Sequence, residues 1–378
     1  MIEDIRKEID CIDDEIANLF EKRLEKVKQI GLQKQKTNTM IYSPQREKEI
    51  LNRVTKGKSE EQKLYIKNLF ENIMFQSKSY QRKYVSCASK IADKIKQSAK
   101  DGYSEFPISA SVACQGVDGA YSGIAAEKLF ELSDITYFKN FEGVFNAVDK
   151  GLCEYGILPI ENSTAGSVLA VYDLMKKHSF YIVKSVRMQI SHVLAVKSGG
   201  TIDKIKTIYS HEQAISQCNE YIKKLSVDSV CMENTAVAAK MVSSSEDDTI
   251  ACICSEKCAR LYGLKVLEKG IQDNANNFTR FICISKDLRI IKGADKISIM
   301  TSLENKAGSL NKTLSLFASE GLNLSKLESR PIPNCQFEFM FYFDFEGDIA
   351  KDGVINLIAE LDNNSDKFAF LGAYKEIL

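Results

Sequence analysis

The 378-residue sequence has no net charge, no long apolar run and little histidine. Its 51 Lys and Arg residues balance 51 Asp and Glu residues, so nothing in the charge favours a nucleic acid or an anionic membrane as partner. No apolar run is long enough to span a bilayer, and the N-terminal residues do not form a signal-peptide pattern. With 44% hydrophobic and 27% charged residues, we expect a globular, cytoplasmic protein of two or three domains.

Metal-ligating residues are sparse. His178, His192 and His211 are the only histidines, and the eleven cysteines include no CxxC pair. We therefore expect neither a metal site nor a cofactor. The cysteines are odd in number, scattered and mostly in apolar runs, which indicates reduced thiols in a cytosol. Catalysis must then depend on hydroxyls, amides, carboxylates and cations.

The N-terminal region has the apolar spacing of a long amphipathic helix. Isoleucines recur at steps of three and four residues from Ile2 to Ile16, and the pattern continues to Ile30 with no proline before Pro44. A helix of about 35 residues is roughly 50 Å long, which is too long for one small domain to cover. We therefore expect a homodimer, or a higher oligomer built from it.

Two cations interrupt the apolar stripe of this helix. Arg23, Val27, Ile30 and Lys34 are spaced so that all four lie on nearly one face. Either the two cations extend to the surface along their aliphatic stems, or they bind an anion. The residues alone leave both alternatives open.

Two shorter helices are expected next. Ser43 and Pro44 suit the N-cap and first position of the second helix. A third helix is predicted from about Glu60 to Tyr84, and its apolar stripe turns polar at Ser77 and Gln81. These two side chains could meet the cations of the first helix inside a helical bundle.

In order and spacing these residues resemble the all-helical chorismate mutases, in which three helices per chain form an intertwined dimer with shared active sites. The resemblance implies that Arg23 and Arg6 of the partner subunit hold the substrate carboxylates, and that Lys34 and Gln81 hydrogen-bond the ether oxygen. The reaction is a pericyclic rearrangement, which needs only a folded conformer held by fixed charges. One position departs from the family, because Ser43 stands where an aspartate is usual. The remaining implied chorismate-binding residues are Arg46, Glu47 (at the ring hydroxyl) and Ser77.

From residue 108 onward, strand and helix patterns alternate. Two such sets are expected, joined by a strand region over Tyr181–Val196 and by the return of Phe278–Ile284 to the first set. A helix is expected over Glu212–Lys224 in the second set. This alternation predicts a two-lobed α/β domain with a cleft between the lobes, and ligands bind such folds at strand ends.

Four polar loops are expected at that cleft. Each has an ordinary explanation: a plain turn for the glycine loop, an N-cap for Ser210, and an edge strand with Arg280 in solvent for the last. The alternative for the last loop is a buried strand, in which Thr279 and Arg280 would need polar partners. The four loops are Gly116–Ser122, Pro159–Ser167, Tyr209–Gln213 with Gln217 beyond it, and Asn276–Phe281.

Together the four loops resemble those of prephenate dehydratases. The resemblance implies loss of carbon dioxide and the ring hydroxyl from prephenate, with Thr279 at the departing hydroxyl and with Asn162, Ser210 and Gln217 orienting the substrate. Arg280 either binds a carboxylate or braces the cleft. The first loop departs from the family, which usually has Leu-Gly-Pro where this chain has Cys114–Val117. Further prephenate-binding residues implied by the resemblance are Gly119, Tyr121, Ser122, Glu161 and Ser163.

The last ninety residues have the order βαββαβ, which is ferredoxin-like (α+β). Aromatic residues alternate strictly from Phe337 to Phe345, so one face of that strand needs a cover of helices or of a second copy. The segment resembles ACT regulatory domains that bind phenylalanine. The implied effector-binding residues are Ala307, Gly308, Ser309 and Leu310 in the glycine loop, and Glu328, Ser329, Arg330 and Pro331 in the second motif.

In this order the three segments resemble the bifunctional chorismate mutase/prephenate dehydratases, with a C-terminal domain for feedback by phenylalanine. The expected architecture is an all-α three-helix mutase domain (1–86), a linker (87–107), a two-lobed, periplasmic-binding-protein-like α/β dehydratase domain (108–285) and an ACT domain (296–378). Two alternatives remain open: a non-catalytic amino-acid sensor, and a dehydratase whose helical domain only dimerises.

Overall fold

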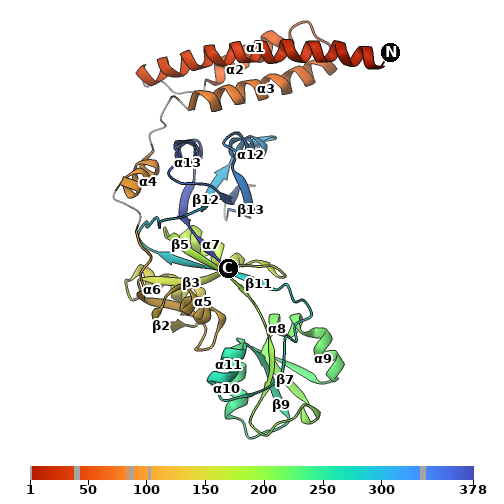
Figure 1. Cartoon of the computed structure of the whole chain (residues 1–378), viewed down its shortest axis with the longest axis vertical. Coiled ribbons are helices and arrows are strands. Elements are labelled where there is room, and N and C mark those ends of the chain that lie inside the picture. The colour runs from red at the N-terminus through yellow and green to blue at the C-terminus, as the bar shows by residue number, and fades with distance from the viewer. Residues whose placement is uncertain (1, 38–42, 83, 85–88, 101–103, 333–337) are drawn as a thin grey trace. The chain divides into compact units, whose positions relative to one another are not determined.

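The computed structural model describes residues 2–37, 43–82, 84, 89–100, 104–332 and 338–378 (Figure 1). The chain divides into two compact units. One unit contains Met1–Gln97 and Ile299–Ala369, and the other contains Ser98–Ser298 and Phe370–Leu378. The second unit therefore includes C-terminal residues that the sequence assigns to the last domain.

Three helices form the N-terminal part: α1 (Ile2–Thr37), α2 (Pro44–Thr55) and α3 (Glu60–Arg82). The 36 residues of α1 match the expected length. Ser43 is the N-cap of α2, as predicted, although its side chain makes no capping hydrogen bond. Both α1 and α2 pack against α3. No helix in the described part of the chain combines the length and the apolar character that crossing a membrane requires.

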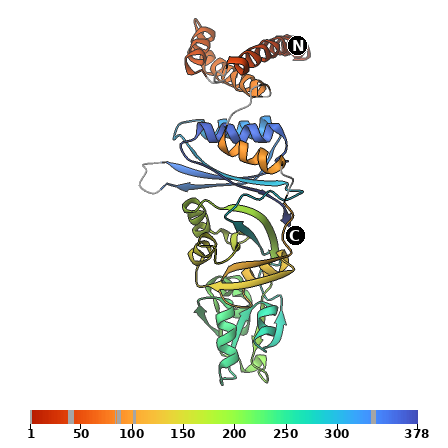
Figure 2. The ribbon, with the colours of Figure 1, turned by 90° about the vertical axis from the view of Figure 1, so that its left-hand side faces the viewer.

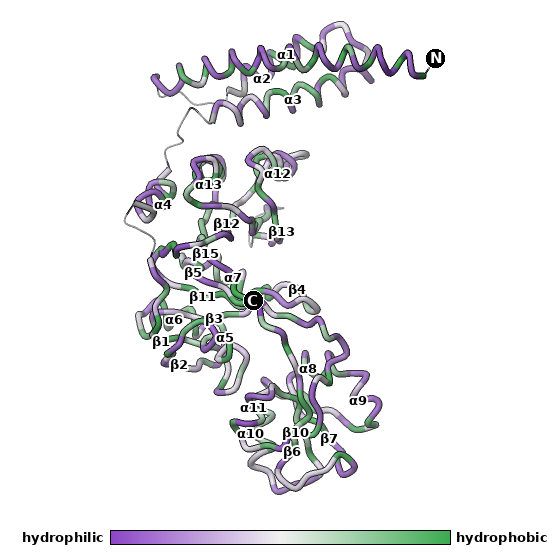
Figure 3. Tube along the Cα trace, viewed as in Figure 1, coloured by the Kyte–Doolittle hydropathy of each residue, from purple (hydrophilic) through white to green (hydrophobic). Residues whose placement is uncertain are grey.

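The isoleucine stripe of α1 lies at the surface of the single chain. Six residues of the stripe are between 49% and 70% exposed: Ile2, Ile5, Ile9, Ile12, Ile16 and Leu19. The described buried residues of α1 are Val27 and Gly31, whereas Ile30 is 48% exposed. Ile30 is therefore exposed in the single chain, because α3 packs on the Gly31 side of the helix, where Gln81 lies against the glycine. Hydrophobic residues are interspersed along the whole of α1 in Figure 3.

The first lobe of the second unit is built on a seven-stranded sheet of order β16-β5-β11-β3-β1-β2, with β4 paired to β3. Strands β1, β2 and β3 are parallel, and β11 runs antiparallel between β3 and β5. The predicted return of the chain to the first lobe through β11 is therefore confirmed. The strands are β1 (Ser109–Gln115), β2 (Leu132–Phe138), β3 (Tyr155–Asn162), β4 (Gly166–Ser167), β5 (Tyr181–Gln189), β11 (Phe278–Ser285) and β16 (Glu376–Ile377), and the helices are α5 (Tyr121–Leu129), α6 (Phe141–Asp149) and α7 (Leu169–Lys177).

Strand β3 lies in the interior of this lobe, and its sequence explains why. Tyr155, Ile157, Leu158 and Ile160 are buried on both faces of the sheet, as expected for a strand covered on both sides. Gly156 lets α6 approach closely, because a Cβ atom there would lie 2.8 Å from Cγ1 of Val144. The carboxyl end of β3 is thus fixed by packing on each side.

The second lobe has a five-stranded sheet of order β10-β6-β9-β7-β8. The predicted strand over Tyr181–Val196 is two strands, because the chain leaves the first sheet after β5 and enters the second at β6. The predicted helix over Glu212–Lys224 is likewise two helices that meet at Cys218. The elements are β6 (Val193–Val196), β7 (Thr207–His211), α8 (Glu212–Gln217), α9 (Asn219–Leu225), β8 (Asp228–Met232), α10 (Thr235–Ser244), β9 (Ile250–Cys254), α11 (Glu256–Leu261) and β10 (Lys265–Lys269), with a 3-10 turn at Ile202–Lys204.

The C-terminal part has the predicted βαββαβ order, and its sheet order is β13-β14-β12-β15. This is the ferredoxin-like arrangement. Helix α12 covers part of the aromatic face of β14, since Phe317 lies 5.3 Å from Phe343 and 5.0 Å from Phe345 between ring centroids. Phe337, predicted in this strand, lies outside the described residues. The elements are β12 (Lys296–Leu303), α12 (Ser309–Ser319), β13 (Asn323–Pro331), β14 (Phe339–Glu346), α13 (Asp352–Asn364) and β15 (Phe368–Tyr374).

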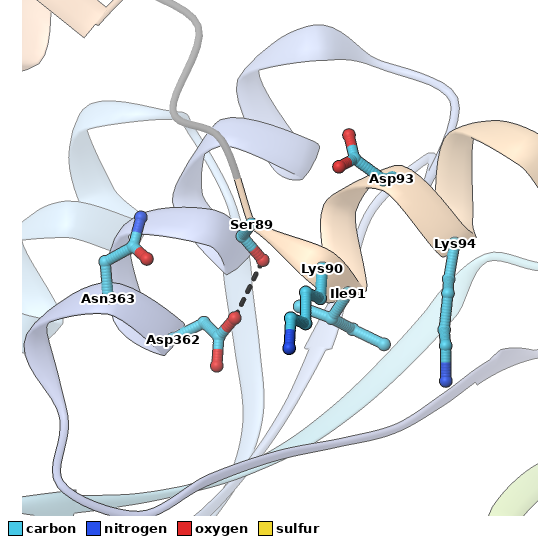
Figure 4. A pocket seen from close by; sticks show the side chains of 7 residues that line it. All are labelled: Ser89, Lys90, Ile91, Asp93, Lys94, Asp362 and Asn363. Atoms are coloured by element: carbon cyan, nitrogen blue, oxygen red, sulfur yellow. Dashed lines mark hydrogen bonds between the residues drawn. The ribbon is translucent and has the colours of Figure 1, made fainter.

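One helix of the predicted linker packs on this part of the chain. Helix α4 (Lys90–Lys100) lies beside α13 (Figure 2). Ser89 joins the two helices, because its hydroxyl donates to Oδ2 of Asp362 at 2.7 Å (Figure 4). The same hydroxyl accepts from the backbone N–H of Ala92 at 3.2 Å. Ile95 of α4 is fully buried. The weakly apolar pattern at Ile91 and Ile95 predicts a helix from Cys87 to Ser98, and the first two residues of that helix lie outside the described residues.

The last strand, β16, ends in a cluster of charges in the first lobe. It pairs in parallel with β5 at Ser185 and Val186. Its Glu376 carboxylate lies 2.8 Å from Arg187, 3.2 Å from Lys296 and 3.9 Å from Arg280. One largely buried carboxylate therefore neutralises part of the charge of three cations.

Replacing Glu376 with alanine removes this shared counter-charge. We expect the free energy of unfolding of the two-lobed unit to fall by about 1 to 3 kcal/mol, because the buried Arg280 and Lys296 lose a counter-ion. Urea unfolding followed by far-ultraviolet circular dichroism measures the change.

The matched control is Glu142→Ala, which removes an exposed ion pair with Lys177 at 2.7 Å in the same lobe. Exposed ion pairs contribute little to stability, because water and salt screen them, so this variant should unfold close to wild type. Equal losses in the two variants would contradict the special role of Glu376.

Candidate active sites

The helical part brings three of its predicted site residues together. A guanidinium N–H of Arg23 on α1 donates to the hydroxyl of Ser77 on α3, and that hydroxyl donates to the carbonyl of Ile73 at 2.6 Å. Gln81 follows one turn later on α3 and is 8% exposed. Its Oε1 atom is buried and has no hydrogen-bond partner among the described residues. The contact between α1 and α3 thus includes the Arg23 cation and, one turn of α3 further on, the Gln81 carbonyl oxygen as an acceptor.

Burial lowers the pKa of the Arg23 guanidinium and of the Lys34 ammonium. The physical cause is desolvation, which disfavours the charged form. Both cations are therefore partly withdrawn from water rather than fully extended into it. Cations in this condition favour an anionic partner.

The other predicted residues of this site lie apart in the single chain. Glu47 on α2 pairs with Lys78 on α3 at 2.7 Å, which ties these helices together. Arg46 pairs with Glu49 of its own helix at 3.1 Å and is exposed. Arg6 and Ser43 are also exposed.

The polar cluster at the ends of β3 and β11 is the best-connected candidate site of the first lobe. Asn162 and Thr279 face each other in register across the two strands. The Nδ2 atom of Asn162 donates to Oγ1 of Thr279 at 2.9 Å, to Oδ1 of Asn277 at 2.7 Å and to the carbonyl of Phe278 at 3.2 Å. The cluster is more than nine-tenths buried at Asn162, Asn277 and Thr279.

The amide of Asn162 is held in one orientation. Its Oδ1 atom accepts from the backbone N–H groups of Thr164 at 3.0 Å and Ala165 at 2.8 Å. The NH2 group must therefore point to Thr279. Because Thr279 Oγ1 accepts this hydrogen bond, its own proton remains available for donation.

Ser163 adds a second tie between the same two segments. Its hydroxyl donates to the carbonyl of Asn276 at 2.9 Å and accepts from the backbone N–H of Phe278 at 2.9 Å. The loop after β3 and the loop before β11 are thus joined by side chains as well as by the strands.

Arg280 is buried beside this cluster, so the edge-strand alternative is wrong. Its strand β11 lies between β3 and β5, and its side chain is 2% exposed. The Nε atom lies 2.9 Å from Oε1 of Glu161. Arg280, the residue directly after Thr279, is therefore held in place by its ion pair with Glu161.

Asn277 belongs to this site: it lies in the fourth polar loop predicted from the sequence, which gives it no role of its own. It is 1% exposed, and its Nδ2 atom has no partner in the part of the chain that the structure describes. Its backbone carbonyl accepts from the N–H of Ile190 at 2.7 Å. In the sequence, the feature that points to Asn277 is a pair of asparagines just before an apolar strand.

The glycine loop of the first lobe reaches the second lobe. Gly119 has φ of +88°, and a Cβ atom there would lie 3.2 Å from Cys258 of α11. Its carbonyl accepts from the hydroxyl of Ser255 at 3.3 Å. A cavity of about 240 Å³ lies between the lobes near this loop and is lined by Gly116, Val117, Tyr137, Phe138, Lys139, Glu233, Asn234 and Val237.

Two further loop residues use their hydroxyls inside the fold. Ser122 donates to the carbonyl of Gln115 at 2.5 Å, and Tyr121 donates to the carbonyl of Ser191 at 2.7 Å. Burial also raises the pKa of the Tyr121 phenol. Tyr121 therefore links the first lobe to the segment that crosses to the second.

The predicted site residues of the second lobe are Ser210 and Gln217. Ser210 is fully buried, and its hydroxyl donates to the carbonyl of Ile253 at 2.7 Å. The N-cap of α8 is His211 rather than Ser210, since Nδ1 of His211 accepts from Gln213 at 3.2 Å. Gln217 Oε1 lies 3.0 Å from Nε2 of His192.

The two motifs of the C-terminal part lie on different elements. Gly308 has φ of +85° and is the N-cap of α12, directly before Ser309 and Leu310. The residues Glu328, Ser329, Arg330 and Pro331 end β13 and pair with β14. The loop residues Lys306, Ala307 and Gly308 are exposed.

Comparisons with known proteins agree with this arrangement. Residues 5–82 match the family model of chorismate mutase type II, and residues 112–289 match that of prephenate dehydratase. The bifunctional chorismate mutase/prephenate dehydratase of Aquifex aeolicus is 30% identical over 100% of this chain and 98% of its own. Arogenate dehydratase/prephenate dehydratase 2 of Arabidopsis thaliana is 36% identical over 70% of this chain and 72% of its own.

A solved structure is similar to more than half of the chain. The prephenate dehydratase of Arthrobacter aurescens, in complex with L-Phe, has a TM-score of 0.65 and 29% identity over 70% of this chain and 90% of its own. Together, the two family models in sequence order and the full-length relative leave one assignment: the chain belongs to the bifunctional chorismate mutase/prephenate dehydratases.

Proposed function

We propose that this chain converts chorismate to prephenate in its helical part, and prephenate to phenylpyruvate, carbon dioxide and water between the two lobes. The observation that carries the second reaction is the hydrogen bond from Asn162 to Thr279, which leaves the Thr279 proton free. The first reaction rests on the partly desolvated cations beside Gln81.

In the mutase reaction the protein supplies fixed charges and no nucleophile. Arg23 and Arg6 of the partner subunit hold the two carboxylates and fold the substrate into its reactive conformer. Lys34 and Gln81 donate to the ether oxygen, where negative charge grows as the C–O bond breaks. Glu47 accepts from the ring hydroxyl, and Arg46 and Ser77 complete the pocket. Ser43 caps α2 where the family has an aspartate.

The dimer that this pocket requires is supported by α1. The exposed isoleucine row of the single chain needs an apolar cover, and a second α1 offers the same row. Arg6 lies on this part of α1 and is exposed in one chain. A partner helix would place it over another chain's site.

We expect Lys34→Ala to lower the mutase kcat by about 100-fold or more, because a donor to the developing charge is lost. Loss of chorismate absorbance measures this rate. Lys36→Ala, two residues along the same helix and exposed, is the matched control and should act as wild type. A Lys34→Ala variant as fast as wild type would mean that the helical part only dimerises.

In the dehydratase reaction the driving force is aromatisation of the ring. The bond to the carboxylate breaks, its electron pair enters the ring, and the C–O bond at the far carbon breaks. Thr279 donates to the departing hydroxide, which leaves as water after one proton is taken up. Asn162, Ser210 and Gln217 orient the substrate, the backbone at Gly119 approaches it, and Glu161 holds Arg280 in place. Tyr121, Ser122 and Ser163 complete the prephenate pocket.

Thr279→Ala should lower dehydratase kcat by about 100-fold or more while the mutase rate stays at the wild-type value. The alkaline ultraviolet absorbance of phenylpyruvate measures the product. Thr279→Ser keeps the hydroxyl and should retain much of the activity. Loss of both activities in the alanine variant would indicate damage to the fold, and no product from folded wild type would favour a non-catalytic sensor.

A second substrate for the dehydratase is favoured by one comparison. The relative from Arabidopsis thaliana is named for both arogenate and prephenate. Arogenate carries an amino group where prephenate has a keto group, and the leaving groups are the same. Comparing kcat/KM for the two substrates decides between them, and we expect prephenate to be preferred because the full-length relative is named for it.

The C-terminal βαββαβ part is proposed to be an ACT domain that binds phenylalanine and inhibits the dehydratase. The backbone at Gly308, with Ala307, Ser309 and Leu310, would hold the amino-acid carboxylate at the start of α12. Glu328, Ser329, Arg330 and Pro331 supply the second wall. Inhibition follows if phenylalanine binds one arrangement of the domains better than the other.

Gly308→Ala should weaken phenylalanine binding by about 10-fold or more, because the Cβ atom strains the left-handed backbone and blocks the ligand's approach. Titration calorimetry with phenylalanine measures the dissociation constant. The matched control is Gly321→Ala, at another left-handed glycine with open space around it in the same part of the chain. This variant introduces the same backbone strain away from the proposed phenylalanine site. Equal weakening by both variants would remove Gly308 from the site.

A cytoplasmic location is also proposed. All nine described cysteines are free thiols, and seven of the nine are buried: Cys114, Cys153, Cys218, Cys252, Cys254, Cys258 and Cys283. Reduced thiols of this kind suit a reducing compartment.

A further inference from the structure

His192 lies in the segment that crosses from the first lobe to the second. It is 2% exposed and sits between the end of β5 and the start of β6. Its backbone N–H donates to Oε1 of Gln272 at 3.0 Å, and its carbonyl accepts from the N–H of Gly270 at 3.0 Å. The ring of Tyr121 packs edge-on at 6.2 Å between centroids. The imidazole is therefore fixed by both crossing segments.

These surroundings favour the neutral form of the imidazole. Burial lowers the pKa of His192, and the hydrogen bond to Gln217 opposes this only in part. A neutral imidazole has one N–H donor and one acceptor nitrogen. Two tautomers are therefore possible for His192, with the proton on Nδ1 or on Nε2.

The hydrogen-bond partners of the two ring nitrogens of His192 distinguish these tautomers. Nε2 lies 3.0 Å from Oε1 of Gln217, whereas Nδ1 is buried without a partner within the described chain. A proton on Nδ1 would bury an unpaired donor, and buried N–H groups without partners are rarer than unpaired acceptors. The proton therefore belongs on Nε2, which donates to the Gln217 carbonyl oxygen.

This donation determines the orientation of the Gln217 amide. Once Oε1 is bound to His192, the NH2 group must point away from the ring. No hydrogen bond of that NH2 group occurs inside the described parts of the chain, and the side chain is partly exposed at the end of α8. The backbone carbonyl of Gln217 accepts from Asp273 at 2.7 Å, so the second crossing segment holds the same residue.

We propose that His192 is a positioning residue of the dehydratase: it holds the Gln217 amide with its NH2 group toward the substrate. This rests on the proposed dehydratase function and adds a role for a residue outside the predicted site. The hydrogen bond also makes the donor at Gln217 depend on the segment between the lobes. Gln217 is then correctly oriented only while the two lobes keep this relationship.

Kinetics of the full-length enzyme test the proposal. His192→Leu should lower dehydratase kcat by about 10-fold to 100-fold, as expected for loss of an oriented donor, with a smaller change in KM. His192→Gln places an amide N–H where Nε2 was and should recover most of the rate. The mutase rate should stay at the wild-type value in both variants. His178→Leu, at another histidine of the first lobe stacked on Phe145 and Phe180, is the matched control.

A double-mutant cycle separates positioning from mere packing. If His192 acts through Gln217, then adding His192→Leu to Gln217→Leu should cost almost nothing further. Fully additive losses, or an inactive His192→Gln variant that remains folded, would overturn the proposal.

A second measurement does not depend on turnover. Nitrogen-15 spectra of the labelled imidazole should report the proton of His192 on Nε2 near neutral pH, and this signal should change in Gln217→Leu. A proton on Nδ1 would refute the inference even in an active enzyme. The Nε2 tautomer in a protein without dehydratase activity would contradict the proposed function and leave the hydrogen bond established.

Discussion

The ion pair between Arg280 and Glu161 is the constraint on which the first lobe depends. A guanidinium in the middle of a seven-stranded sheet costs several kcal/mol unless carboxylates meet it. Glu161 on β3 and Glu376 on β16 meet it from two sides. With the cation paired, β11 can occupy the centre of the sheet, and Thr279 then lies opposite Asn162. The position of the reactive hydroxyl is thus a consequence of how one buried charge is neutralised.

The two crossing segments extend this order to the second lobe. They are bound to each other at Ile190 and Asn277, and again at His192 and Gly270. The Asn162 cluster contacts one segment through Asn277, and Gln217 contacts both. Residues from different lobes therefore share one hydrogen-bonded frame, and the site depends on the junction as much as on the loops that the sequence singles out.

Much of the fold follows from local pattern, and the exceptions have physical reasons. Local apolar spacing is enough to predict the 36-residue helix, the alternating strands and helices, and the ferredoxin-like order. The break between β5 and β6 at Ile190–His192 cannot be predicted from local pattern, because the same apolar residues would suit one continuous strand or two strands in different sheets. The hydrogen-bond partners of Asn277 and His192 are likewise distant in sequence, so no local pattern marks these two residues. Ile30 lies at the surface of the single chain because a glycine, not the apolar residue, faces α3.

The pairing of β3 with β11 also has a consequence for folding. Thr279 and Asn162 are 117 positions apart, and the whole second lobe lies between them in the chain. Contacts with such separation form slowly, because closing a long loop costs entropy before any contact compensates it. The second lobe has its own sheet and needs no residue of the first to complete its strand order. We therefore expect the inserted lobe to form early and to close the loop, and the hydroxyl cluster to be assembled as one of the last events.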